Sequence, residues 1–429
     1  MSQGDPVVIV GAGLAGLCCA LGLSAAGVQC QIVEAADDVG GRVRTDFVEG
    51  FLLDRGFQVL LTAYPEARRV LDYDRLNLQS FNSGAIVRRN GSFNKLLFPL
   101  RHPQAMVSAA ISPVMTLGDK LRALGLWNSL RSGDAESLLN SGSEQTTEDE
   151  LKAQGFSPTA IESFFRPFFG GVFLQPRLTT SSRFFRFMFR MFAEGSAAVP
   201  EQGMAQIPQQ LAARVKAAGV TIQLNTRVTD LTPTRVTLAD GKILSASAVV
   251  VAAELPEAQR LIGQDLASGA GAERSACTLY FAADRPCVGE PTLVLNGDGA
   301  AGGPLNHLAE MSSVAGSYAP QGATLISASV LDSRGMNDAD LQQAVVNQLV
   351  GWYGRSVRTW RHLRTYWISH ALPPLEPPTL QNPERSVRIG RGLFACGDHR
   401  DQASIQGAFN SGRRAAEAVI SQLQAANGV

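Results

Sequence analysis

The pattern of apolar and polar positions along the chain begins with a short apolar run at residues 7–10, which consists of valine and isoleucine. Such a β-branched run is typical of a buried parallel strand. Three glycines in the spacing G-x-G-x-x-G follow, and apolar residues then recur at helical spacing. A second apolar strand over residues 29–33 leads into Glu34, whose carboxylate can accept hydrogen bonds from both hydroxyls of an adenosine ribose. This order of elements predicts a βαβ unit that binds a dinucleotide.

Each residue of the glycine turn has a physical role in such a unit. Gly11 permits the tight turn, Gly13 leaves room for a pyrophosphate, and Gly16 lets the helix pack close to the strand. The backbone amides at the helix N-terminus, at Leu14 and Ala15, are free to donate to phosphate oxygens. A glycine-rich structural turn is the alternative, and this stretch alone does not separate FAD from NAD.

Later apolar patterns predict further strands and helices of an α/β protein. The predicted elements are a helix over 206–218, strands over 220–224 and 248–253 with a three-stranded meander between them, a strand over 392–396 and a helix over 413–423. The segment 260–384 has mainly strand-like patterns, with one helix expected over 338–351.

Residues 116–200 combine helical patterns with turn residues. We expect a helix within 116–130 and a surface loop over 132–145, which is polar and contains glycine and serine. Thr147 fits the first position of a capping box, and Ser157 followed by Pro158 fits the start of another helix.

Half of the chain's 20 phenylalanines fall between residues 164 and 192. They are Phe164, Phe165, Phe168, Phe169, Phe173, Phe184, Phe185, Phe187, Phe189 and Phe192. On a helix starting near residue 180, three arginines share one face, and apolar residues lie broadly opposite. One interpretation is a core helix with a solvated arginine stripe. The other is the wall of an apolar tunnel, or a face that contacts a membrane.

Composition and charge narrow the class of protein. The 429 residues are 45% hydrophobic and 18% charged, which predicts a globular chain of two domains. Lys plus Arg and Asp plus Glu both number 38, so no basic field favours nucleic acid. The six cysteines have no metal-ligand spacing, and no metal is expected. Without a recognisable signal peptide or a run of ~18–20 apolar residues, we expect a cytoplasmic protein.

The residues that follow Glu34 make the cofactor more specific. The pattern G-G-R-x-R-T over residues 40–45 places Arg42 where its guanidinium can neutralise a pyrophosphate bidentately. Together with Asp54-x-Gly56, this pattern resembles the start of the flavin amine oxidase superfamily, which includes amine oxidases, protoporphyrinogen oxidases and carotenoid desaturases. The resemblance implies FAD as cofactor. It also implies cofactor contacts from Gly41, Arg42, Gly56 and Phe57.

The C-terminal residues resemble the closing motif of the same superfamily, in the form closest to phytoene desaturases. Gly397-Asp398 follows an apolar strand, and S-x-x-G-A begins at residue 404. The resemblance implies that Asp398 binds the ribityl or pyrophosphate part of FAD. It also implies that the helix N-terminus at Ile405 points at the flavin, and that Val228 offers its backbone to the adenine.

The resemblance also implies a domain organisation. A Rossmann-like FAD-binding domain of the glutathione-reductase type would comprise residues 1–80, 200–260 and 385–429. An inserted mixed α+β substrate domain would comprise residues 81–199 and 261–384.

Two further segments have competing interpretations. Residues 297–302 spell a second G-x-G-x-x-G, but Gly303-Pro304 follows in place of a helix, so a hairpin loop is expected. Aromatic residues before His370-Ala371-Leu372 resemble the segment that closes over the flavin in protoporphyrinogen oxidases. Strands and a loop of the second domain are the alternative.

Three functional hypotheses remain from the sequence. The leading one is an FAD-dependent oxidoreductase that removes hydride from a lipophilic substrate, either an isoprenoid or carotenoid or a porphyrinogen-like tetrapyrrole. Its electron acceptor, oxygen or a quinone, and a peripheral membrane contact are left open. The second is an amine oxidase that releases peroxide, and the third is a non-enzymatic escort of prenylated GTPases that shares the fold. No catalytic residue is assigned, because the five histidines are scattered and no triad or paired carboxylates occur.

Overall fold

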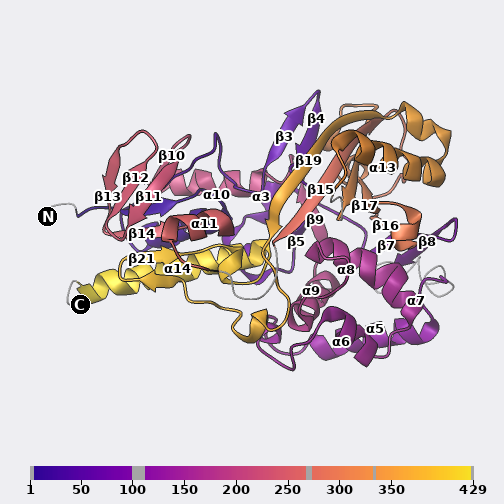
Figure 1. The fold of residues 1–429 in the computed structure, drawn as a ribbon, viewed down its shortest axis with the longest axis horizontal. Coiled ribbons are helices and arrows are strands. Elements are labelled where there is room, and N and C mark those ends of the chain that lie inside the picture. The colour runs from indigo at the N-terminus through magenta and orange to yellow at the C-terminus, as the bar shows by residue number, and fades with distance from the viewer. Residues whose placement is uncertain (1–3, 99–111, 267–272, 332–334, 427–429) are drawn as a thin grey trace.

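Two large sheets lie towards opposite ends of the long axis of the molecule, and a group of helices lies beneath the second sheet (Figure 1). The computed structural model describes residues 4–98, 112–266, 273–331 and 335–426. The fold is a mixed α/β fold, as the sequence predicts.

The first sheet has six strands in the order β10-β2-β1-β14-β21-β20, and the first five run parallel. Its strands are β1 (Val7–Val10), β2 (Cys30–Val33), β10 (Thr221–Gln223), β14 (Ala248–Val251), β20 (Arg388–Gly390) and β21 (Leu393–Ala395). Segments far apart in the sequence therefore build one sheet. The apolar runs predicted as strands near its centre are all found there.

Both faces of this sheet are buried, which explains the uninterrupted apolar run of β1. Val7 and Ile9 pack into the core that contains α1 and α14, while Val8 and Val10 pack into a second core with α11 and a three-stranded meander. The elements on these faces are α1 (Leu14–Ala25), α10 (Gln206–Ala217), α14 (Ile405–Ala426), α11 (Leu255–Ile262), β11 (Val228–Thr232), β12 (Arg235–Leu238) and β13 (Ile243–Ser245). Burial on both faces is the usual state of a parallel sheet.

The second sheet has seven strands in the order β19-β15-β18-β17-β16-β7-β8. Its strands are β7 (Gly84–Arg89), β8 (Ser92–Leu97), β15 (Arg274–Ala283), β16 (Val294–Asn296), β17 (Leu305–Glu310), β18 (Thr324–Val330) and β19 (Arg361–Leu372). Helix α13 (Asp338–Tyr353) covers one face through Leu341, Val345 and Leu349. The opposite face is turned towards a large cavity.

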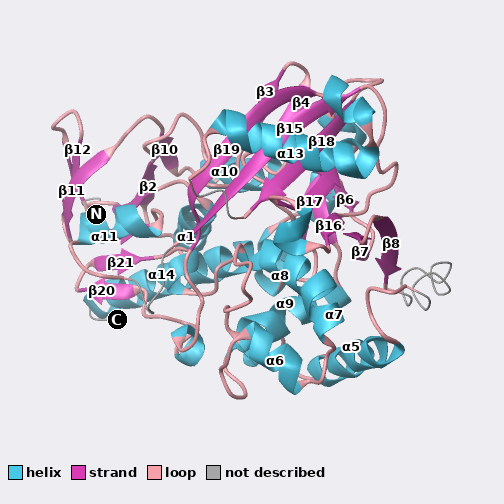
Figure 2. Ribbon diagram, turned by 45° about the vertical axis from the view of Figure 1, so that its right-hand side comes forward, coloured by secondary structure: helices cyan, strands magenta, loops and turns pink. Residues whose placement is uncertain are grey.

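Helices from the middle of the chain lie beneath the second sheet (Figure 2). They are α5 (Leu117–Leu130), α6 (Thr147–Ala153), α7 (Pro158–Ala160), a π-helical turn (Ile161–Phe165), α8 (Arg166–Phe173) and α9 (Ser182–Glu194). Residues of α5, the π-helical turn, α8 and α9 form another wall of the cavity. The remaining elements are the hairpin β3 (Thr45–Val48) and β4 (Phe51–Asp54), the small sheet of β5 (Leu60–Leu61), β6 (Leu78–Ser80) and β9 (Ala197–Pro200), and the short helices α2 (Pro65–Val70), α3 (Tyr73–Leu76) and α12 (Met311–Val314).

The predicted capping box is wrong by one residue. Thr146, not Thr147, caps α6, because its hydroxyl accepts a hydrogen bond from the amide of Asp149 at 3.1 Å. The buried Thr147 hydroxyl instead donates to the carbonyl of Thr180 at 2.7 Å. The start of α7 is as predicted, with Ser157 as N-cap and proline at the first helical position.

The arginine stripe of α9 is not a solvated face. Arg186 forms an ion pair with the buried Glu150 at 2.8 Å, and Arg190 is itself buried and donates to the carbonyl of Gly133 at 2.9 Å. Arg183 donates to the carbonyl of Gly142 at 2.7 Å. The predicted surface loop 132–145, which also contains a 3-10 turn at Glu136–Leu139, is therefore held against α9 by these arginines.

The second glycine motif is a hairpin loop, as predicted. Strands β16 and β17 pair antiparallel, and residues 297–302 connect them through the short turn Gly299–Gly302. None of the helices in the described ranges combines the length and apolar character that crossing a bilayer requires.

Candidate functional site

A cavity of about 1190 Å³ extends from the carboxyl ends of β1 and β2 to the second sheet and helices α5, α8 and α9. Thirteen of the 14 residues predicted to contact the cofactor line this cavity. They are Gly11, Gly13, Leu14, Ala15, Glu34, Gly41, Arg42, Gly56, Phe57, Val228, Gly397, Asp398 and Ile405. Gly16 lies behind the wall.

The three glycines of the first turn meet different surroundings. A Cβ at Gly11, whose φ is +112°, would lie 2.6 Å from the carbonyl oxygen of Ala252, and a Cβ at Gly16 would lie 2.1 Å from that of Gly11. Gly13 has no atom within 4 Å of the same position and faces the cavity. Gly11 and Gly16 are therefore fixed by packing, whereas the space at Gly13 is open for a ligand.

The N-terminus of α1 presents its amides to this space. Gly13 is the N-cap, and within the described residues no side-chain cap occupies the first turn of the helix. Uncapped amides at a helix N-terminus are suited to binding phosphate oxygens. This geometry fits the pyrophosphate of a dinucleotide.

Glu34 is held rigidly at the carboxyl end of β2. Its Oε2 accepts a hydrogen bond from the amide of Ala12 at 2.7 Å, and its Oε1 accepts one from the amide of Ala36 at 2.8 Å. Each carboxylate oxygen can accept a further hydrogen bond. Val228, predicted to face the adenine, also lines the cavity, and the amide of Thr226, two residues before it, donates to the carbonyl of Glu34 at 2.7 Å.

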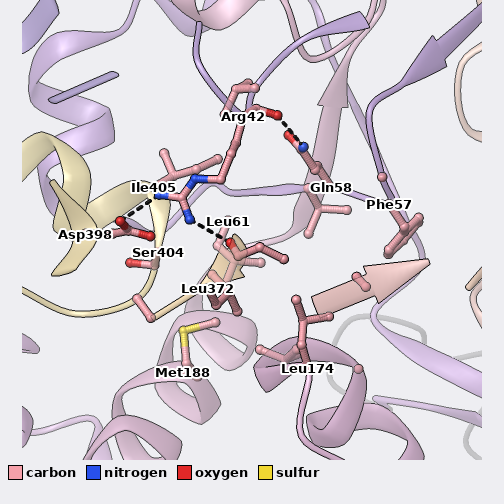
Figure 3. A pocket seen from close by; sticks show the side chains of 18 of the residues that line it. Arg42, Phe57, Gln58, Leu61, Leu174, Met188, Leu372, Asp398, Ser404 and Ile405 are labelled. Carbon is pink, nitrogen blue, oxygen red and sulfur yellow. Dashed lines mark hydrogen bonds and ion pairs between the residues drawn. The ribbon is translucent and has the colours of Figure 1, made fainter. Parts of the chain in front are cut away.

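Arg42 connects three segments at the centre of the cavity (Figure 3). Its Nη2 lies 2.6 Å from Oδ1 of Asp398, and its Nη1 donates to the carbonyl of Ala371 at 2.6 Å. The side-chain amide of Gln58 in turn donates to the backbone carbonyl of Arg42 at 2.8 Å. The guanidinium thus has an anionic partner within the protein. The carbonyl of Ala371 belongs to the end of β19, so this strand approaches the predicted cofactor residues.

Asp54 supports the loop that carries Gly56 and Phe57. Its carboxylate is buried and accepts hydrogen bonds from the Thr45 hydroxyl at 2.5 Å, the Met204 amide at 2.9 Å and the Tyr318 hydroxyl at 2.8 Å. Burial raises the pKa of Asp54 from 3.8 to about 6, and these hydrogen bonds act in the opposite direction. The sequence pattern included Asp54 but gave no role for it.

The phenylalanine-rich segment is both core and cavity wall. Of its ten phenylalanines, those that line the cavity are Phe164, Phe165, Phe168, Phe169, Phe184, Phe189 and Phe192. Phe173, Phe185 and Phe187 are buried in the core behind them. Figure 3 shows Met188 of α9 below Arg42 and Asp398, so the apolar wall reaches the predicted cofactor residues.

Among the residues that the structure describes, His307 and His370 are the two histidines that line the cavity, and the sequence singles out neither as functional. His307 is buried on β17, and burial lowers its pKa to about 4. His370, near the end of β19, has its Nδ1 in hydrogen-bond contact with Glu273. His399, the neighbour of Asp398, is buried but does not line the cavity. Only the strand pairing of the second sheet brings His307 to the site, and no local pattern signals it.

A family model of flavin-containing amine oxidoreductases matches residues 14–420. The chain belongs to this family. It is therefore an FAD-dependent oxidoreductase, and the uncapped α1 amides, the open space at Gly13 and the acid at Glu34 fit that cofactor.

Two curated relatives are porphyrinogen oxidases. The chain is 26% identical over 172 residues to protoporphyrinogen oxidase 2 of Arabidopsis thaliana, covering 39% of this chain and 32% of that protein. It is 26% identical over 420 residues to coproporphyrinogen III oxidase of Propionibacterium freudenreichii subsp. freudenreichii, covering 81% of this chain and 78% of that protein. The crystal structure of a putative protoporphyrinogen oxidase from Exiguobacterium sp. 255-15 superposes with a TM-score of 0.74 at 18% identity, covering 99% of this chain and all of that one.

Proposed function

We propose that this protein oxidises a porphyrinogen-like tetrapyrrole in the apolar part of the cavity. The observation that carries the proposal is the continuity of one cavity from the predicted FAD residues to the phenylalanine wall. The similarity to two porphyrinogen oxidases supports a tetrapyrrole over an isoprenoid or carotenoid.

In this proposal the chain's own residues bind and orient the cofactor. The α1 amides and the space at Gly13 take the pyrophosphate, Glu34 takes the ribose, and the backbone of Val228 faces the adenine. Arg42 takes part in neutralising the pyrophosphate, and Asp398, its ion-pair partner, binds the ribityl or pyrophosphate part. When bound, FAD supplies the oxidising centre that accepts a hydride from a substrate C–H bond.

The protein's contribution to the reaction is positioning and the exclusion of water. Phenylalanine rings from α8 and α9 form a wall on which a large apolar ring system can lie. Removal of a hydride from such a substrate requires no strong acid or base beside the reacting carbon. We therefore assign no catalytic acid or base.

The mouth of the cavity suggests how a lipophilic substrate enters. Leu117 and Leu121 of α5 line the cavity, yet they are 68% and 61% exposed, and Leu124 beside them is 39% exposed. Exposed leucines at this spacing form one apolar face of the helix. We propose that this face touches a membrane surface peripherally and receives the substrate there.

Anaerobic reduction of the bound flavin tests the proposal. Mixing the FAD-loaded protein with coproporphyrinogen III or protoporphyrinogen should bleach the flavin absorbance. Phytoene and putrescine, tested in parallel, represent the carotenoid and amine alternatives and should leave the flavin oxidised. Bleaching by phytoene or putrescine alone, or by none of these compounds, contradicts the proposal.

A further inference from the structure

Three polar side chains form a row across the cavity face of the second sheet. Thr278 on β15 pairs with Ser329 on β18, and Ser329 pairs with His307 on β17. Directly paired residues of antiparallel strands point to the same face, and all three line the cavity. Their neighbours on the opposite face, including Leu279 and Leu308, pack in the core with α13. The polar row therefore interrupts an otherwise largely apolar cavity.

Two members of the row lack a hydrogen-bond partner. The Ser329 hydroxyl and Nε2 of His307 have none in the described residues, although both side chains are buried. Thr278 differs, because its hydroxyl accepts a hydrogen bond from the Phe57 amide at 3.3 Å. Buried polar groups in native proteins are usually paired. Two unpaired groups on adjacent strands in one cavity wall therefore indicate a ligand that pairs with them.

The surroundings of His307 determine which nitrogen carries its proton. Nδ2 of Asn306 donates to the carbonyl of Pro167 at 2.9 Å and lies 3.0 Å from Nδ1 of His307. Because the carbonyl can only accept, the Asn306 amide nitrogen is the donor to both groups. Nδ1 of the neutral imidazole is then an acceptor, and Nε2 carries the hydrogen. His307 and Ser329 can both donate a hydrogen bond.

The row lies beside the loop predicted to contact the flavin. The ring of His307 is 4.8 Å from the ring of Phe57 in an edge arrangement, and Thr278 contacts the Phe57 backbone. A substrate group bound here would fix the position of the rest of the molecule in front of that loop.

We propose that His307 and Ser329 bind an acceptor oxygen of the substrate, of the kind that a carboxylate side chain supplies. This assignment rests on the proposed porphyrinogen oxidation and makes it more specific. The two residues orient the ring in the apolar cavity and select substrates that carry such a group. A pure hydrocarbon would leave both donors unpaired, which disfavours its binding.

The test compares two porphyrinogens in anaerobic flavin reduction, with the dissociation constant read from the dependence of the rate on substrate concentration. Coproporphyrinogen III carries carboxylate side chains, whereas etioporphyrinogen has alkyl groups in their place. The wild-type protein should bind the first at least tenfold more tightly. Ser329→Ala and His307→Leu should each reduce this preference severalfold, and His307→Gln, which keeps an N–H donor, should restore part of it.

Ser327→Ala is the matched control. Ser327 is a fully buried hydroxyl two residues earlier on β18 that does not line the cavity, so its removal should leave the preference unchanged. Flavin content and spectrum should be unchanged in every variant. If Ser329→Ala keeps the wild-type preference, the assignment is wrong even where His307→Leu fails to fold. If wild-type flavin is reduced by neither porphyrinogen, the proposed function fails together with the assignment.

Discussion

The buried carboxylate of Asp54 makes a specific prediction about the pH dependence of stability. This side chain is 1% exposed, and burial raises its pKa from 3.8 to about 6 despite three hydrogen bonds. Asp54→Asn keeps the shape of the side chain and an oxygen acceptor for Thr45 and Met204. The substitution removes the titrating group and little else.

The sign and size of the effect follow from linkage. Between pH 3.8 and about 6, the folded protein holds on Asp54 a proton that the unfolded chain has released. The free energy of unfolding therefore falls as pH rises through this range, and the loss persists above it. A shift of about two pKa units, at ~1.4 kcal/mol each, amounts to roughly 3 kcal/mol. Asp54→Asn lacks this contribution, so its stability relative to wild type should rise by roughly that amount between pH 4 and pH 7.

Urea unfolding at saturating FAD, followed across this pH range for both proteins, measures the difference. Asp240→Asn, at an exposed hairpin turn, is the control for the change of aspartate to asparagine. The two proteins differ in hydrogen bonding at every pH, so only the change of the difference with pH is diagnostic. Parallel curves for Asp54→Asn and wild type would refute a raised pKa for Asp54.

Further predictions concern the cofactor and the membrane. Gly13→Ala should fold normally but retain at least tenfold less FAD on dialysis, because its Cβ meets only the open cavity, whereas Gly11→Ala should lose soluble folded protein. Equal behaviour of these two variants would contradict their different surroundings. Glu34→Ala should weaken FAD binding about 10- to 100-fold in a fluorescence titration, and unchanged affinity would exclude a ribose contact. The double variant Leu117→Glu, Leu121→Glu should lose co-sedimentation with anionic vesicles while keeping its FAD, and equal sedimentation would remove α5 from the membrane contact.

The sequence predicted the parts of the fold that short-range patterns determine. The apolar character of β1 and β14 is by itself enough to predict that these strands are buried on both faces. Ser157 caps its helix through a hydrogen bond to a residue three positions along the chain. The second glycine motif predicts a hairpin loop because a proline follows it in place of a helix, and β16 and β17 on either side of it pair antiparallel. In each case the decisive interaction lies within a few residues along the chain or depends only on apolar character.

The features that the sequence could not predict depend on contacts between residues that are far apart along the chain. The role of Asp54 depends on Tyr318, which is 264 residues away. The arginine stripe of α9 is paired and not solvated, because Arg186 forms an ion pair with Glu150 on another helix. His307 and Ser329 meet only through the register of two strands. Of the cofactor residues, the structure brings 13 to one cavity wall, and their contacts with FAD and the division into domains stay predictions.

The contact between Arg42 and Asp398 has a consequence for how the protein matures. The two residues are 356 positions apart, and β21, which precedes Asp398, pairs with β14 in the first sheet. The N-terminal βαβ unit emerges from the ribosome long before the strand and the helix that complete the site have been synthesised. Tight cofactor capture must therefore wait until the chain has been synthesised through α14, and until then the growing chain exposes an apolar sheet that needs protection from aggregation.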